Sequence, residues 1–196
     1  MKYACVLTVC AVFVGLVATE RTKRQLDDTA LIEKYPFIVA ITYNGNFVGN
    51  GVLVSGMWIL STATVLANPT PANTYRTYAG SANYKSGSRE NVVQLIIQHP
   101  EYTSSSPANN IAMALMAKLY EETTHLQSVN LGINDVPSSS GTMATFGSGD
   151  KMQEVPSSLQ SDETCISKLT DEANKKLVGD GLGYCVTIDG PYALGP

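Results

Sequence analysis

Residues 37–54 read FIVAITYNGNFVGNGVLV, and WILSTA follows at 58–63. Both stretches are rich in β-branched and aromatic residues, which favour strands. Asn44-Gly45 lies in the middle of the first stretch, and both residues tolerate the positive φ that a two-residue hairpin turn requires. The sequence therefore predicts two antiparallel strands joined by a tight turn, with a third strand beginning at Trp58.

Further short strands are predicted downstream. TYRTYAGS (74–81) and NVVQLIIQHPEY (91–102) flank the turn-rich ANYKSGSR, and TMATFGSG (142–149) is a short strand between glycines. The apolar run NIAMALMAKL (110–119) fits a strand or a helix by periodicity alone. Many short strands separated by turn signals indicate an all-β barrel or sandwich.

One surface helix is predicted over SDETCISKLTDEANKKL (161–177). Ser161 can cap it and Gly179 can end it. Its apolar residues share one face, as expected of a helix that covers a sheet, and they are Ile166, Leu169, Ala173 and Leu177.

The amino terminus is typical of an exported protein. Residues 1–18 carry Lys2 and then an apolar run shorter than the ~20 residues of a membrane span, so we expect a signal peptide ending at Ala18 rather than an anchor. Residues 19–24 form a short pre-segment that ends in Lys23-Arg24. We expect processing after Arg24, although a merely solvated charge pair is the alternative. The expected location is extracellular.

Cysteine use agrees with export. Only Cys165 and Cys185 follow the signal, and an even pair in an oxidising compartment favours a disulfide over two buried thiols. A bridge closing about 20 residues stabilises a fold by about 3 kcal/mol on the chain-entropy model. No Cys/His spacing suggests zinc, and we expect no metal and no cofactor. Residues 119–196 carry eleven acidic and four basic residues, which argues against nucleic acid and anionic membranes as partners.

The chain resembles the trypsin/chymotrypsin family of serine proteases, especially its insect members. GNGVLVSGMWILSTATV (49–65) is similar to the family's C-G-G-x-L-I-x-x-x-W-V-L-T-A-A-H-C. KYPFIVAI (34–41), YRTYAGSANYKSG (75–87), IIQHPEY (96–102), SDETC (161–165) and GYC (183–185) follow in the family's order. The resemblance implies a double antiparallel β-barrel and, for the family, serine-type endopeptidase activity.

The resemblance also shows where the catalytic residues should be. Thr64 stands at the place of the histidine base, and Asn110 or Ala112 at the place of the aspartate. The nucleophile motif G-D-S-G-G-P has no match in IDGPYALGP (188–196), where no serine follows Asp189, and we expect the sequence to stop just before that motif. A threonine hydroxyl has no useful basicity near neutral pH, so we expect no catalytic residues in this chain.

Four further positions depart from the family or carry no catalytic role in it. Gly49 and Val65 replace the two cysteines of the disulfide beside the base. His99 falls in the H-P-x-Y match, which has no catalytic role in the family. His125 falls in a polar link. We expect both histidines to be structural or solvated.

The expected organisation is a first β-barrel over 25–122 and a partial second barrel over 123–196, which together form one peptidase S1-like domain. We expect a secreted, non-catalytic serine protease homologue that binds an active protease, an inhibitor or a protease substrate. The alternatives are a truncated record of a trypsin-like endopeptidase and a plain secreted β-protein without a binding role. The sequence assigns no oligomeric state.

Overall fold

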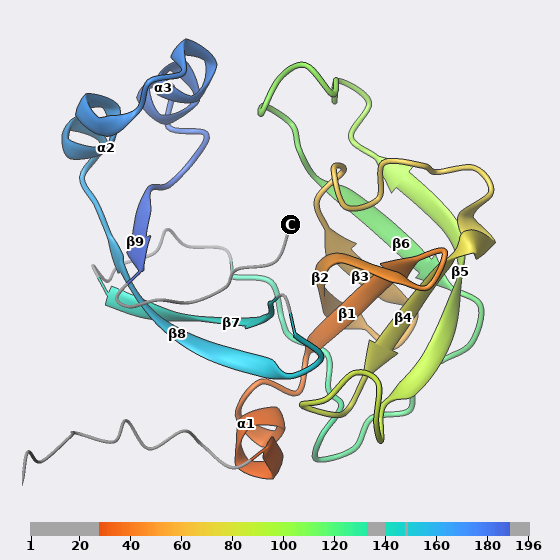
Figure 1. The fold of residues 1–196 in the computed structure, drawn as a ribbon. Coiled ribbons are helices and arrows are strands. Elements are labelled where there is room, and N and C mark those ends of the chain that lie inside the picture. The colour runs from red at the N-terminus through yellow and green to blue at the C-terminus, as the bar shows by residue number, and fades with distance from the viewer. Residues whose placement is uncertain (1–27, 133–139, 148, 189–196) are drawn as a thin grey trace, which may run out of the picture.

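The computed structural model describes residues 28–132, 140–147 and 149–188. Its larger part is a closed six-stranded barrel, and its smaller part is a three-stranded sheet that carries two short helices (Figure 1). A further helix, α1 (Asp28–Lys34), precedes the barrel. The expectation of an all-β fold with one complete barrel and a partial second sheet is confirmed.

The barrel contains six antiparallel strands in the order β1-β2-β3-β6-β5-β4. They are β1 (Ile38–Tyr43), β2 (Asn46–Ser55), β3 (Trp58–Ser61), β4 (Tyr75–Ala79), β5 (Arg89–Gln98) and β6 (Ala112–Met116), with a 3₁₀ turn η1 (Ala72–Thr74) before β4. Asn44 and Gly45 form the predicted hairpin turn, with φ values of 50° and 80°. The ambiguous run at 110–119 contains a strand, because it pairs with β3 and β5.

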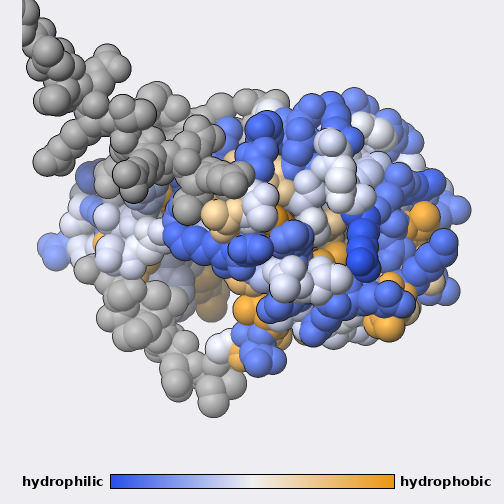
Figure 2. Space-filling view, turned by 90° about the horizontal axis from the view of Figure 1, so that it is seen from below, coloured by the Kyte–Doolittle hydropathy of each residue, from blue (hydrophilic) through white to orange (hydrophobic). Residues whose placement is uncertain are grey.

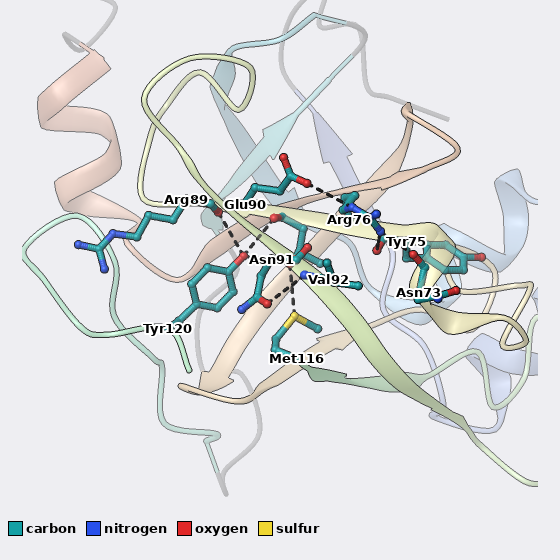
Figure 3. Close-up of polar contacts among 10 residues, drawn as sticks. Asn73, Tyr75, Arg76, Arg89, Glu90, Asn91, Val92, Met116 and Tyr120 are labelled. Carbon is teal, nitrogen blue, oxygen red and sulfur yellow. Dashed lines mark hydrogen bonds and ion pairs between the residues drawn. The ribbon is translucent and has the colours of Figure 1, made fainter. Parts of the chain in front are cut away.

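The barrel interior is apolar with one polar cluster. Alternate residues of each strand point inward and pack, among them Val39, Ile41 and Leu53. The Tyr120 hydroxyl lies 2.9 Å from Thr77 Oγ1 and donates to the carbonyl of Arg89 at 3.3 Å (Figure 3). Burial raises the pKa of Tyr120, because the charged phenolate would lose its hydration there.

The smaller sheet has the strand order β7-β8-β9, with β7 (Ser140–Phe146), β8 (Met152–Leu159) and β9 (Val186–Ile188). Cys165 and Cys185 form the predicted disulfide, with a Cα–Cα distance of 5.9 Å. This bridge ties the helical segment to the chain that leads into β9.

The prediction of one helix over 161–177 is wrong. The segment forms two helices, α2 (Asp162–Lys168) and α3 (Glu172–Gly179). Leu169 is extended (ψ 139°), and the Asp171 side chain accepts a hydrogen bond from the Asn174 amide as the cap of α3. Aspartate competes with the helical backbone for hydrogen bonds, so at this position it starts a new helix. Ser161 caps α2 as predicted.

Barrel and sheet meet at a second apolar cluster. Ile38 and Ala40 of β1 pack there with Phe146 and Met152 of the smaller sheet. The Asn50 side chain donates to Thr145 Oγ1 at 2.8 Å and accepts from the Phe146 amide at 2.8 Å. The face that carries α1 is mostly hydrophilic, with hydrophobic residues in small separate groups (Figure 2).

Candidate functional site

Thr64 and Asn110 meet at one end of the barrel. Ser61 of β3 is paired with Ala112 of β6, and the strands are antiparallel, so the end of β3 and the start of β6 lie side by side. Thr64 follows β3 and Asn110 precedes β6. Asn110 Oδ1 accepts a hydrogen bond from the Thr64 amide at 2.9 Å and another from the Thr64 hydroxyl at 3.0 Å.

Ala112, the alternative position for the carboxylate, lies elsewhere. It is buried in the barrel core and does not face Thr64. Tyr102 joins the pair instead, because its hydroxyl lies 3.3 Å from Thr64 Oγ1. In the sequence, the H-P-x-Y match is the one signal that points to Tyr102.

The cluster therefore consists of an alcohol, an amide and a phenol. An alcohol and an amide do not exchange protons near neutral pH, and a phenol is a weak acid and no useful base. The amide oxygen orients the threonine hydroxyl, as a carboxylate would orient an imidazole, but it carries no charge. The group can present hydrogen bonds to a bound molecule and has no general base.

The two histidines are engaged away from this cluster. His99 Nδ1 accepts from the Glu101 amide at 3.2 Å, and its backbone amide donates to the Ile111 carbonyl. His125 Nε2 lies 3.2 Å from Glu33 Oε1 at an exposed position. These contacts fit the structural and solvated roles expected of them.

Gly49 and Val65 are in direct contact. A Cβ atom built on Gly49 would lie 2.5 Å from Val65 Cγ2, closer than real atoms approach. Gly49 also has a φ of +155°, which side chains rarely adopt. Glycine at position 49 thus leaves room for the side chain of Val65.

An open groove of about 380 Å³ lies beside the cluster. Asn110 lines it together with residues of the barrel and of β7, and the walls are mainly apolar. The apolar lining is Ile38, Gly51, Val52, Leu60, Ile111 and Ala144, and the polar lining is Asn50, Ser61, Thr62 and Asn110. Its walls come from distant parts of the sequence, so the sequence alone did not indicate it.

Several expected features lie outside the described residues, namely Lys23-Arg24 and Asp189 with the segment around it. Within residues 28–132, 140–147 and 149–188, no group of three or more His, Cys, Asp or Glu side chains could hold a metal ion. In the same residues, every helix is too short or too polar to cross a membrane.

The family model of trypsin matches residues 27–182, which is most of the chain. The match covers the closed barrel, β7 and β8 of the smaller sheet, and both α2 and α3. The activity of that family is serine-type endopeptidase activity. On this match and on the barrel topology, the chain belongs to the trypsin family.

Proposed function

We propose that this chain is a secreted, non-catalytic member of the trypsin family that acts by binding another protein. The observation that supports this most is the contact between Thr64 and Asn110 at the positions of the family's base and carboxylate. Asn110 Oδ1 accepts from both Thr64 donors, and the pair holds no group that takes a proton at neutral pH.

The missing charges matter as much as the missing base. In a serine protease, a carboxylate holds the imidazole and stabilises the imidazolium that forms during acyl transfer. Asn110 offers the same acceptor geometry without the negative charge. Thr64 is too short and too weakly basic to take a proton from a nucleophile several ångströms away. In this proposal, Thr64 and Asn110 stand at the positions of the base and the carboxylate, and neither can take over the proton transfer.

The groove beside Asn110 supports a binding role. It is open, mainly apolar, and has a few polar groups in its lining, as protein sites for peptides and small ligands do. Ile111 lines it and is 46% exposed, so an apolar side chain of a partner would find a contact there without rearrangement of the core. The proposed partner is an active protease, a protease inhibitor or a protease substrate.

Two alternatives remain as competing functions. An active endopeptidase with its nucleophile beyond residue 196 is favoured only by the family's general activity. If the chain is a secreted β-protein with no binding role, the groove should bind none of these proteins.

The binding proposal is tested by titrating immobilised secreted protein with three probes. These are an active trypsin-family protease, a protein inhibitor of such proteases, and a protein substrate. We expect saturable binding of one probe, and Ile111→Glu weakens it about ten-fold or more, because the change places a charge in an apolar contact. The matched control is Leu182→Glu, at a residue that is 67% exposed and outside the groove. Binding of no probe, or equal losses in both variants, would overturn the proposal.

A further inference from the structure

The last strand of the smaller sheet, β9, runs toward the groove beside Asn110. It is antiparallel to β8, and its last residue, Ile188, lies opposite Ser157. Further along β8 in the direction in which β9 runs, Glu154 is paired with Ala144 of β7. Ala144 lines the groove. The chain therefore leaves Ile188 on a course toward the groove.

The local sequence favours departure from the sheet at this point. The residue of β8 that follows Ser157 in that direction is Pro156. Proline has no N–H group to donate to a neighbouring strand, so pairing is weakened there. Gly190 precedes Pro191, and the residue before a proline favours extended backbone. Residues 189–196, DGPYALGP, are therefore suited to continue as an extended segment rather than as a longer β9.

This segment is long enough to reach the groove. Ile188 lies level with Gly141 of β7, with β8 between them, and Gly141 is three residues before Ala144. Two strand spacings and three residues along a strand are each about 10 Å, so Ile188 and Ala144 are roughly 14 Å apart. An extended segment of the length of 189–196 spans up to about 26–29 Å. It can therefore pass Ala144 and enter the groove.

The groove and the segment also match in chemistry. The described residues that line the groove include no charged side chain, and most of them are apolar. The segment carries Tyr192, Ala193 and Leu194 in succession, and its one charged side chain, Asp189, is at the end next to β9. Insertion of these three residues removes apolar surface from water without burying a charge.

The covalent link favours this segment over a separate molecule. A segment on a short linker has an effective concentration in the millimolar range, which a second copy or a free partner seldom reaches. We propose that residues 189–196 occupy the groove beside Asn110 in the free protein, and that a partner must displace them to bind there. The displacement step rests on the proposed function, and it adds how access to the groove is regulated.

The first test measures the accessibility of a thiol placed in the segment of the whole secreted protein. Cys165 and Cys185 are joined in the disulfide, so the new cysteine of Leu194→Cys reacts alone with an alkylating reagent. Cysteine also keeps the position apolar. We expect alkylation at least ten-fold slower than that of the same variant in denaturing urea. Leu182→Cys, at a residue that is 67% exposed, should react at nearly its rate in urea.

A change in the groove shows whether the groove causes this protection. Ile111→Glu, combined with Leu194→Cys, should raise the alkylation rate at least five-fold, because a charge in the apolar wall expels the segment. The matched control is Leu119→Glu, at an exposed residue outside the groove, which should leave the rate unchanged.

Two results of the alkylation test would overturn the proposal: equally fast alkylation of Leu194→Cys and Leu182→Cys, or no effect of Ile111→Glu. Protection that grows with protein concentration would assign the groove to the same segment of a second copy and would also overturn it.

The second test separates this inference from the proposed function. Leu194→Glu keeps the full chain and puts a charge in the segment, so it should vacate the groove. The apparent Kd of a partner is its intrinsic Kd divided by the fraction of protein with a free groove, so the Kd of the protein probe that binds should fall about ten-fold. Leu182→Glu should leave this Kd unchanged.

The outcomes of the two tests are distinct. A protected thiol without binding of any probe would contradict the proposed function and would still support occupation of the groove by residues 189–196. Binding of a probe with a Kd that Leu194→Glu does not lower would overturn the displacement step and leave the proposed function intact.

Discussion

Asn110 Oδ1 accepts two hydrogen bonds from Thr64, one from its amide at 2.9 Å and one from its hydroxyl at 3.0 Å. A single side-chain oxygen thus closes the loop after β3 onto the start of β6. Under the proposed function, this contact stands where the family would hold a catalytic base, and it serves the fold.

Replacing Asn110 separates its two properties, acceptor geometry and lack of charge. Asn110→Ala removes both acceptor contacts, and because Thr64 is exposed to water the expected loss is about 1 kcal/mol of unfolding free energy. Asn110→Asp keeps the acceptor, so stability should change by less than about 0.5 kcal/mol. Urea unfolding of the two variants checks this. Equal losses in both would mean that the hydrogen bonds to Thr64 do not hold the loop.

The contact between Gly49 and Val65 makes a second prediction. Gly49→Ala should destabilise the fold by roughly 1–3 kcal/mol, because the new methyl group overlaps the valine and the backbone conformation is strained. Val65→Ala in the same chain removes the overlap and should recover part of the loss. The double-mutant cycle measures the recovery as a coupling energy. Strictly additive effects would show that the two side chains do not compete for this space.

Local signals predicted the barrel better than the smaller sheet. Asn44-Gly45 forms a two-residue turn, and the stretches on both sides of it are continuous and rich in β-branched residues. The local sequence is therefore enough to predict this hairpin. In contrast, β8 was not predicted, because it contains Pro156 among polar residues. Proline is tolerated there because β9 pairs only with Ser157, Ser158 and Leu159.

The remaining errors also have local causes. The apolar face predicted over 161–177 continues through Leu169, so periodicity alone indicates one helix. It gives no sign that Asp171 caps a new helix. The helix α1 was missed because its seven residues bury only Leu31 and Ile32. At the site, the sequence placed Thr64 by its motif but left Asn110 and Ala112 open. Only the strand register separates the residue that meets Thr64 from the one in the core.

The disulfide should account for much of the stability of the helical segment. Replacing Cys165 and Cys185 by alanine is expected to cost about 3 kcal/mol, since the bridge spans 20 residues. Urea unfolding measures the loss, and Ser167→Ala on α2 is the control. Mass spectrometry of an unreduced digest should show the two cysteine peptides joined. Two freely alkylated thiols in secreted protein would contradict the bridge.

Acid should loosen α1 from the smaller sheet. Lys34 at the end of α1 donates to Glu154 of β8, and Tyr35 donates to the same carboxylate at 2.8 Å. The hydrogen bond from Lys34 is the main cause that lowers the pKa of Glu154 below its usual 4.5. A lowered folded-state pKa adds stability above about pH 4.5, and this is lost as the pH falls through the folded value.

Hydrogen exchange of the α1 amides between pH 6 and pH 3 checks this prediction, after correction for the intrinsic rate. Protection should fall at the acid end, and Glu154→Gln should make the fall smaller. Glu163→Gln, at an exposed acid on α2, should leave it unchanged. A profile that Glu154→Gln does not alter would exclude this carboxylate as the cause.

The central claim is that this trypsin-family chain lacks catalysis, and the most direct measurement is labelling by a serine-directed fluorophosphonate probe. The secreted protein should be tested before and after cleavage at Arg24, beside ester and amide substrates and an active family member as positive control. We predict no labelling and no turnover above the buffer blank. Thr64→His should restore neither, and the control variant Thr124→His should give the same result. Stoichiometric labelling of one serine, with ester turnover that is lost on changing Thr64 or Asn110, would contradict the account.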